Sequence, residues 1–244
     1  MDKFDRIYQR ALKRKGGEEA LQACLPKGSS MGDNHNANPL PDISDDRALS
    51  EMTRAIFQAG FVYRVVNQKW PGFEQAFLGF DPKKIILLSP EQIEALSNDK
   101  RIVRNMQKIL SVPQNAQMIL DISAKVGSFA LFLSDWPKSD QFGLHDYLKK
   151  NGSRLGGMTG QRVLRNLGWD SYILTADVIT CMKDAGIDIN DNPTSKRQLK
   201  DIQEAFNRWH DESGHSYVAL SRICACSVGV NYPPEMLDGS SNER

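Results

Sequence analysis

Apolar residues recur at three- and four-residue spacing through most of this chain, which is the periodicity of one face of an α-helix. The first run places Phe4, Ile7 and Leu12 on one side of a helix over residues 2–13. Strand signals are nearly absent, and residues 83–88 (KKIILL) form the only apolar run that resembles a strand. The pattern therefore predicts an all-α fold, a bundle of about ten short helices.

Helix starts and stops follow from local capping signals. Ser89, Pro90 and Gln92 form a capping box, and Asp2 and Thr175 stand where N-caps are expected. Pro113 should kink or divide a long helix over residues 101–126. The remaining helices are expected at residues 18–25, 45–58, 61–70, 129–135, 144–150, 160–167, 175–184, 195–210 and 216–227.

Composition suggests a globular organisation with one polar interruption. The chain has 244 residues, of which 40% are hydrophobic and 25% are charged, and this balance excludes a disordered protein. Residues 27–44 are rich in Gly, Ser, Asn and Pro, as a surface loop or linker would be. We therefore expect N-terminal helices over residues 1–26, a polar loop over 27–44, one helical domain over 45–230 and a flexible tail over 231–244.

The sequence gives no membrane or secretion signal. No apolar run approaches the roughly 20 residues of a membrane span. The first 17 residues are charged from the second position and lack an apolar core. Four dispersed cysteines do not make a disulfide framework. We expect a cytoplasmic protein, associated with the nucleoid, that does not contact membranes.

A basic stretch between residues 149 and 167 stands out against a net charge of +1. It contains no Asp or Glu, and four glycines lie within it. Phosphate contact requires positive charge and a backbone that can approach closely, so this stretch is a candidate for DNA binding. A solvated loop that leads into a helix explains the same charges. The cations are Lys149, Lys150, Arg154, Arg162 and Arg165.

A helix–turn–helix candidate follows directly. A helix over residues 160–167 stops at Gly168, and Thr175 caps the next one. Such a hairpin presents backbone amides to a phosphate and grips DNA without reading its sequence. A corner between two helices packed into the core is the alternative. The DNA-binding residues expected here are Gly168, Trp169, Asp170, Ser171, Leu174 and Thr175, together with Arg154, Arg162 and Arg165.

Several segments together resemble a known family. They include residues 49–52 (LSEM), 58–61 (QAGF), 72–77 (GFEQAF) and 80–85 (FDPKKI), and further matches follow at 101–105, 108–109, 115–116, 127–129 and 168–186. The chain resembles the 3-methyladenine DNA glycosylase I family, within the helix-hairpin-helix DNA glycosylase superfamily, as a divergent member.

The resemblance implies base excision repair. An enzyme of this kind flips an alkylated base of the 3-methyladenine type out of double-stranded DNA and hydrolyses its N-glycosidic bond. It implies a monomer that binds damaged DNA and uses no small-molecule cofactor. The alternative function is a non-catalytic helix-hairpin-helix protein that binds damaged or distorted DNA. A metal-dependent protein unrelated to DNA is a third class.

The resemblance also suggests a base pocket. Tyr63 stands where the family has its base-stacking tryptophan, and Gln58 and Phe61 accompany it. The family's pocket glutamate falls at Ala55 or Ile56, so no carboxylate is available there. Glu51 lies about one helical turn away.

Asp177 has two interpretations. If residues 155–160 (LGGMTG) form the hairpin, Asp177 lies near the catalytic aspartate of related glycosylases. If the hairpin lies at residues 172–174, Asp177 only caps a helix, and Asp188 and Asp191 become weaker catalytic candidates. We prefer the hairpin at residues 172–174. Asp177 remains the catalytic candidate if the hairpin lies at residues 155–160.

The family's zinc site does not transfer to this chain. The cysteine and histidine spacings match no known zinc motif, so we expect no metal ion. The residues that a four-ligand site would have to use are Cys24, His35, His210, His215, Cys224 and Cys226.

Overall fold

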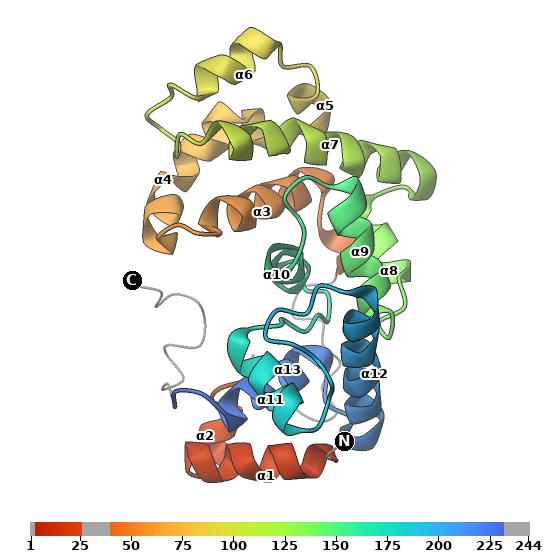
Figure 1. The fold of residues 1–244 in the computed structure, drawn as a ribbon. Helices are drawn as coiled ribbons and strands as arrows, with labels where there is room; N and C mark the ends of the chain where they lie inside the picture. Colours follow the sequence, from red (N-terminus) through yellow and green to blue (C-terminus); the bar gives the residue numbers. More distant parts are fainter. Residues whose placement is uncertain (1–2, 26–39, 232–244) are drawn as a thin grey trace. The chain divides into compact units, whose positions relative to one another are not determined.

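The computed structural model describes residues 3–25 and 40–231. These residues form thirteen α-helices and two short 3-10 helices, and they contain no strand (Figure 1). The predicted all-helical fold is confirmed. The apolar run at residues 83–88 is not a strand, because Asp81 caps a short helix that begins at Pro82 and includes the start of the run.

The described chain divides into two compact units. The first unit comprises residues 3–25, 137–142 and 170–231, and the second comprises residues 40–136 and 143–169. Each unit has a hydrophobic core of its own. The prediction of one helical domain over residues 45–230 differs from this division, because the N-terminal helices pack with helices from the C-terminal third.

Three helices build most of the first unit's core. Helix α1 (Phe4–Lys15) packs against α13 (Tyr217–Ser227) and α12 (Lys196–Ser213). The buried Phe4 ring lies 6.1 Å from Trp209, and the Phe4 amide donates to Glu212 at 3.0 Å. The same unit contains α2 (Glu18–Gln22) and α11 (Ala176–Asp184).

Helices α3 and α7 lie side by side in the second unit (Figure 1). Asp45, at the start of α3, accepts hydrogen bonds from the Ser123 hydroxyl at 2.6 Å and the Phe129 amide at 2.9 Å, and so ties α3 to α7 and α8. The elements of this unit are η1 (Leu40–Asp42), α3 (Asp45–Gln58), α4 (Tyr63–Ala76), η2 (Leu78–Phe80), α5 (Pro82–Ile85), α6 (Pro90–Leu96), α7 (Met106–Val126), α8 (Phe129–Asp135), most of α9 (Gln141–Asn151) and α10 (Met158–Asn166).

Caps set the helix boundaries, as the sequence indicates at two of them. Both hydrogen bonds of the Ser89 capping box are present, and Thr175 caps α11 through the Val178 amide. Helix α7 begins at Met106 rather than residue 101, because Asn105 accepts from the Lys108 amide. Pro113 does not divide α7, which continues to Val126.

Some predictions fall on residues outside the described ranges. These are the Asp2 cap, His35, most of the 27–44 loop and residues 232–244 of the tail. Among the described helices, none alone has the length and apolar character of a membrane span. Helices α7 and α8 meet both criteria only when taken together, and they are bent by 66° at the break between them.

Candidate functional site

Tyr63 is the first residue of α4 and follows a short turn from the end of α3. Gly60 makes this turn possible, because its φ of 71° lies in the left-handed region. The Tyr63 side chain is partly buried, and its hydroxyl accepts a hydrogen bond from Arg162 of α10. The Arg162 guanidinium also lies 5.7 Å from the centre of the Tyr63 ring.

The same face of α10 holds a carboxylate of α3. Asn166 donates to Glu51 at 2.7 Å, one helical turn after Arg162. Burial raises the pKa of Glu51, and the hydrogen bond from Asn166 and the charge of Arg54 oppose that shift. The Arg54 guanidinium lies over the Trp70 ring, 4.5 Å from its centre. Helix α10 therefore binds the Tyr63 phenol and the Glu51 carboxylate on adjacent turns.

The turn between α3 and α4 exposes an aromatic side chain. Phe61 is 44% exposed, and the Lys108 ammonium lies 5.3 Å from its ring centre. That ammonium donates to the carbonyls of Phe57 and Ala59, which fixes the end of α3. Burial lowers the pKa of Lys108, and the charge of Arg154 acts in the same direction. Gln58, which we expected to face the base, donates to the Asn67 side chain at 3.0 Å.

A tight, glycine-rich loop over residues 152–157 joins α9 to α10. Gly157 has a φ of 58°, and Gly160 approaches the Leu155 carbonyl so closely that a Cβ would overlap it. The buried Asn115 side chain donates to the Ser153 carbonyl at 3.1 Å and accepts from the Ser153 amide at 2.7 Å. The loop is therefore a fixed hairpin between two helices, and it overlaps the expected hairpin position at residues 155–160.

The loop over residues 168–175 has a different character. Trp169, Asp170, Ser171 and Tyr172 are all buried. The Trp169 indole donates to the Leu133 carbonyl, and Asp170 caps α13 by accepting from two of its amides.

These side chains fill cores and cap helices, which corrects the expectation that Trp169, Asp170 and Ser171 face DNA. Leu174 is partly buried, and the Thr175 side chain caps α11. Gly168 is exposed and has a φ of 85°.

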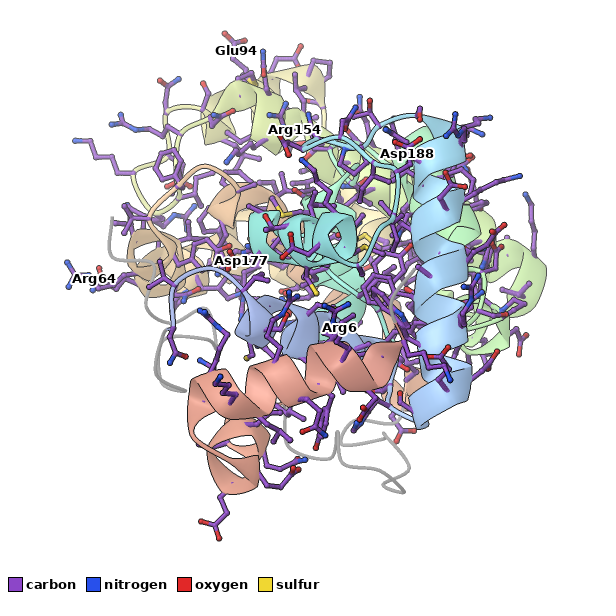
Figure 2. All side chains as sticks on the ribbon, turned by 60° about the horizontal axis from the view of Figure 1, so that its bottom comes forward. Arg6, Arg64, Glu94, Arg154, Asp177 and Asp188 are labelled. Atoms are coloured by element: carbon purple, nitrogen blue, oxygen red, sulfur yellow. The ribbon has the colours of Figure 1, made fainter. Side chains whose placement is uncertain are left out.

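The predicted phosphate-binding cations separate into two groups. Lys149 and Arg154 are exposed, and Arg154 has a φ of 61° and donates to Gln107 at 3.3 Å (Figure 2). Lys150 is also exposed and pairs with Asp146 of the same helix. Arg162 is instead partly buried against Tyr63, and its pKa is lowered by burial. Arg165, on the same helix, is partly buried as well.

Asp177 lies in the first turn of α11, in the first unit (Figure 2). Burial raises the pKa of its carboxyl group, and the Arg14 guanidinium opposes the shift. Gly229 packs directly on this carboxylate, and its carbonyl accepts from Arg14. The alternatives Asp188 and Asp191 are more than 90% exposed and pair with Arg197 and Lys183, as ordinary surface carboxylates do.

The candidate zinc ligands do not gather into one site. Within the described residues, no group of three or more metal-binding side chains is present. The cysteines interact in two pairs: Cys181 with Cys224, and Cys24 with Cys226. Burial raises the pKa of the Cys226 thiol to about 11. The two histidines of this unit, His210 and His215, bind to each other, since the His210 ring contacts the His215 carbonyl at 2.8 Å.

Sequence reasoning missed two elements of this arrangement. Asn166 carried no signal of its own, and Glu51 was noted only for its distance from the expected pocket position. The spacing of Arg162 and Asn166, four residues apart on a basic helix, was the available hint that they share a face.

The sequence of residues 34–151 matches the family model described as methyladenine glycosylase. This segment contains α3, α4 and the turn with Phe61 and Tyr63. It ends before α10 and before the resembling residues 168–186. A comparison with curated proteins finds no match.

Solved structures of three glycosylases are similar to the chain. Two are 3-methyladenine DNA glycosylase I. The enzyme from Staphylococcus aureus has a TM-score of 0.47, 22% identity and coverage of 63% of this chain and 94% of its own. A variant in complex with 3-methyladenine has a TM-score of 0.46, 22% identity and coverage of 54% and 81%. The third is the Methanocaldococcus jannaschii 8-oxoguanine glycosylase/lyase in complex with DNA, with a TM-score of 0.49, 14% identity and coverage of 89% and 95%.

All these TM-scores lie below 0.5, so the comparison with a known family rests on the matched segment. The match confirms the expected class of activity, that of a DNA N-glycosylase, and does not favour the non-catalytic alternative. The likeness of this chain to the methyladenine glycosylase family therefore lies in residues 34–151, which match that family's model.

Proposed function

We propose that the protein releases an alkylated base of the 3-methyladenine type from double-stranded DNA and works as a monomer. The observation that carries this proposal is that residues 34–151 match the methyladenine glycosylase family and hold the exposed turn between α3 and α4. Tyr63 and Phe61 supply the aromatic surface of that turn. An aromatic ring suits a flipped base, because stacking stabilises it whatever its sequence context.

DNA binding is assigned to the hairpin at residues 152–157 rather than to residues 168–175. Arg154 is an exposed cation on the hairpin, Lys149 is an exposed cation at the end of α9, and no acidic residue occurs between positions 149 and 167. It leads into the N-terminus of α10, where free backbone amides and the helix dipole favour a phosphate. The buried side chains at 169–172 leave the other loop without such a surface.

The reaction is a hydrolysis that requires little acid catalysis, because the base is already positively charged. The oxygen of water bonds to C1′ of the deoxyribose, and the C1′–N bond breaks. The bonding electron pair leaves with the base and neutralises its positive charge. One proton of the water goes to a carboxylate or to solvent. Asp177 is the candidate for this carboxylate, because a hairpin at residues 155–160 would place it near the position of the catalytic aspartate in related glycosylases.

Incubation of the purified chain with methylated duplex DNA tests the proposal. Free 3-methyladenine should appear in the supernatant and be identified by chromatography and mass. A heat-treated sample of the protein is the blank, since 3-methyladenine also leaves DNA spontaneously. Release at the blank rate, from a protein that still binds the duplex, would leave only a non-catalytic binding protein.

A further inference from the structure

We propose that the DNA-binding surface of the second unit extends from the hairpin at residues 152–157 onto the start of α7, where Arg104 contacts a backbone phosphate of the duplex. The inference rests on the proposed function, because it names a further contact for the same DNA partner. Arg104 lies outside the basic stretch at residues 149–167 that the sequence singles out.

A second stretch without acidic residues runs into α7. No Asp or Glu occurs between positions 100 and 120, although four cations do: Lys100, Arg101, Arg104 and Lys108. The Arg101 guanidinium pairs with Asp99 at 2.7 Å, and the buried Lys108 ammonium donates to two carbonyls at the end of α3. Arg104 is exposed and has no hydrogen-bond or ion-pair partner among the described residues. Its charge is therefore open to a ligand from solvent.

Two side chains of α7 join the hairpin to this stretch. The Asn115 amide binds both the carbonyl and the amide of Ser153, at 3.1 and 2.7 Å. The Gln107 side chain accepts from the Arg154 guanidinium at 3.3 Å. Arg104 precedes Gln107 by three residues, so at most about 11 Å of backbone separates the two. Because each DNA strand carries a phosphate about every 3.4 Å along the helix axis, Arg104 and Arg154 can reach phosphates of the same strand.

The hairpin side of this surface concentrates positive charge. Arg154 has a φ of 61°, in the left-handed region that is unfavourable for a residue with a Cβ, and such strain is retained where a side chain has a function. Lys149 of α9 reaches the same loop, since a Cβ at Gly156 would lie 3.4 Å from its Cγ. Arg104, Lys149 and Arg154 thus lie in two stretches that hold no acidic residue. A surface of this kind attracts a polyanion, and salt weakens the attraction.

Lys108 connects this surface to the turn between α3 and α4. Its ammonium donates to the Phe57 and Ala59 carbonyls at 3.1 and 2.7 Å, and it directly follows Gln107 in α7. The exposed Phe61 ring of the turn lies 5.3 Å from the same ammonium. A duplex held at the start of α7 therefore lies next to the aromatic turn that the proposed function requires.

Binding of an undamaged fluorescent duplex to R104Q tests the contact, because loss of one phosphate contact has a defined effect on salt dependence. The negative slope of log K against log salt should become shallower by about 1. Affinity should fall about tenfold at about 50 mM salt and about fourfold at about 200 mM, to the same extent for every sequence. R104K keeps the charge and should keep the slope. Tm should not change in either variant, because the Arg104 side chain is exposed.

K125Q is the matched control. Lys125 is an exposed cation in the last turn of the same helix, about 30 Å from its start, and its removal should leave the slope unchanged. An unchanged slope in R104Q would overturn the inference, as would equal changes in R104Q and K125Q or in R104Q and R104K. The assay needs no base release, so a shallower slope in R104Q together with no release above the blank would refute the proposed enzyme and retain this surface.

Discussion

The hairpin assignment makes a sharp prediction at Gly160. A Cβ at this position would overlap the backbone carbonyl oxygen of Leu155 and lie 3.3 Å from its carbonyl carbon. A backbone carbonyl cannot rotate out of the way as the end of a flexible side chain can. Gly160→Ala must therefore move the 152–157 loop relative to α10.

The expected cost is the difference of two terms. Overpacking of this kind costs about 1–3 kcal/mol, while alanine in a helix gains up to about 1 kcal/mol over glycine. We expect a net loss of about 1–2 kcal/mol in the free energy of unfolding. For a chain of this size the Tm should fall by about 2–8 °C. Affinity for duplex DNA should fall about tenfold, because the loop no longer presents its backbone in the same geometry.

Gly72→Ala is the matched control for this effect. Gly72 lies inside α4, and a Cβ there would meet the Arg101 carbonyl, so the same kind of overlap arises away from the hairpin. Melting curves and titrations with a fluorescent duplex should show lower stability for both variants and weaker DNA binding for Gly160→Ala alone. Equal DNA affinities at similar loss of stability would refute the hairpin at residues 152–157.

Three further outcomes are expected. Charge reversal of Lys149 and Arg154 together should weaken binding to every duplex alike. The negative slope of log K against log salt should become shallower by about 2, and an unchanged slope would place the phosphate contacts elsewhere. Tyr63→Ala should abolish base release while DNA binding and Tm stay near their original values, whereas a proportional loss of all three would make Tyr63 a core residue. Asp177→Asn should lower the release rate without lowering Tm at pH 7, because burial raises the pKa of Asp177 and so disfavours its charged form in the fold; an unchanged rate would exclude it from the reaction.

Local signals carried much of the fold prediction. The caps at Ser89 and Thr175 are where the sequence places them, because a cap bonds to amides within three residues. The division into two units could not be predicted in this way. It depends on contacts such as Phe4 with Trp209, which lie far apart in the sequence, and no local pattern in either segment indicates that the two will pack together.

The candidate site was harder to predict than the helices, because it also depends on contacts between residues that are distant in the sequence. Residues 152–157 and 168–175 both contain glycine and precede a helix, so the sequence could not rank them. Burial separates them, and the burial of Trp169 depends on the distant Leu133. The sequence predicts Arg162 as one more phosphate-binding cation, because it gives the charge of this residue but not its hydrogen bond to Tyr63.

The rate at which the purified chain releases 3-methyladenine from duplex DNA tests the central claim most directly. Enzyme in excess over a duplex with one lesion gives a single-turnover rate that excludes slow product release from the measurement. We expect stoichiometric release well above the spontaneous rate, and loss of that release in Tyr63→Ala. Tight binding of the duplex with release at only the spontaneous rate would contradict it.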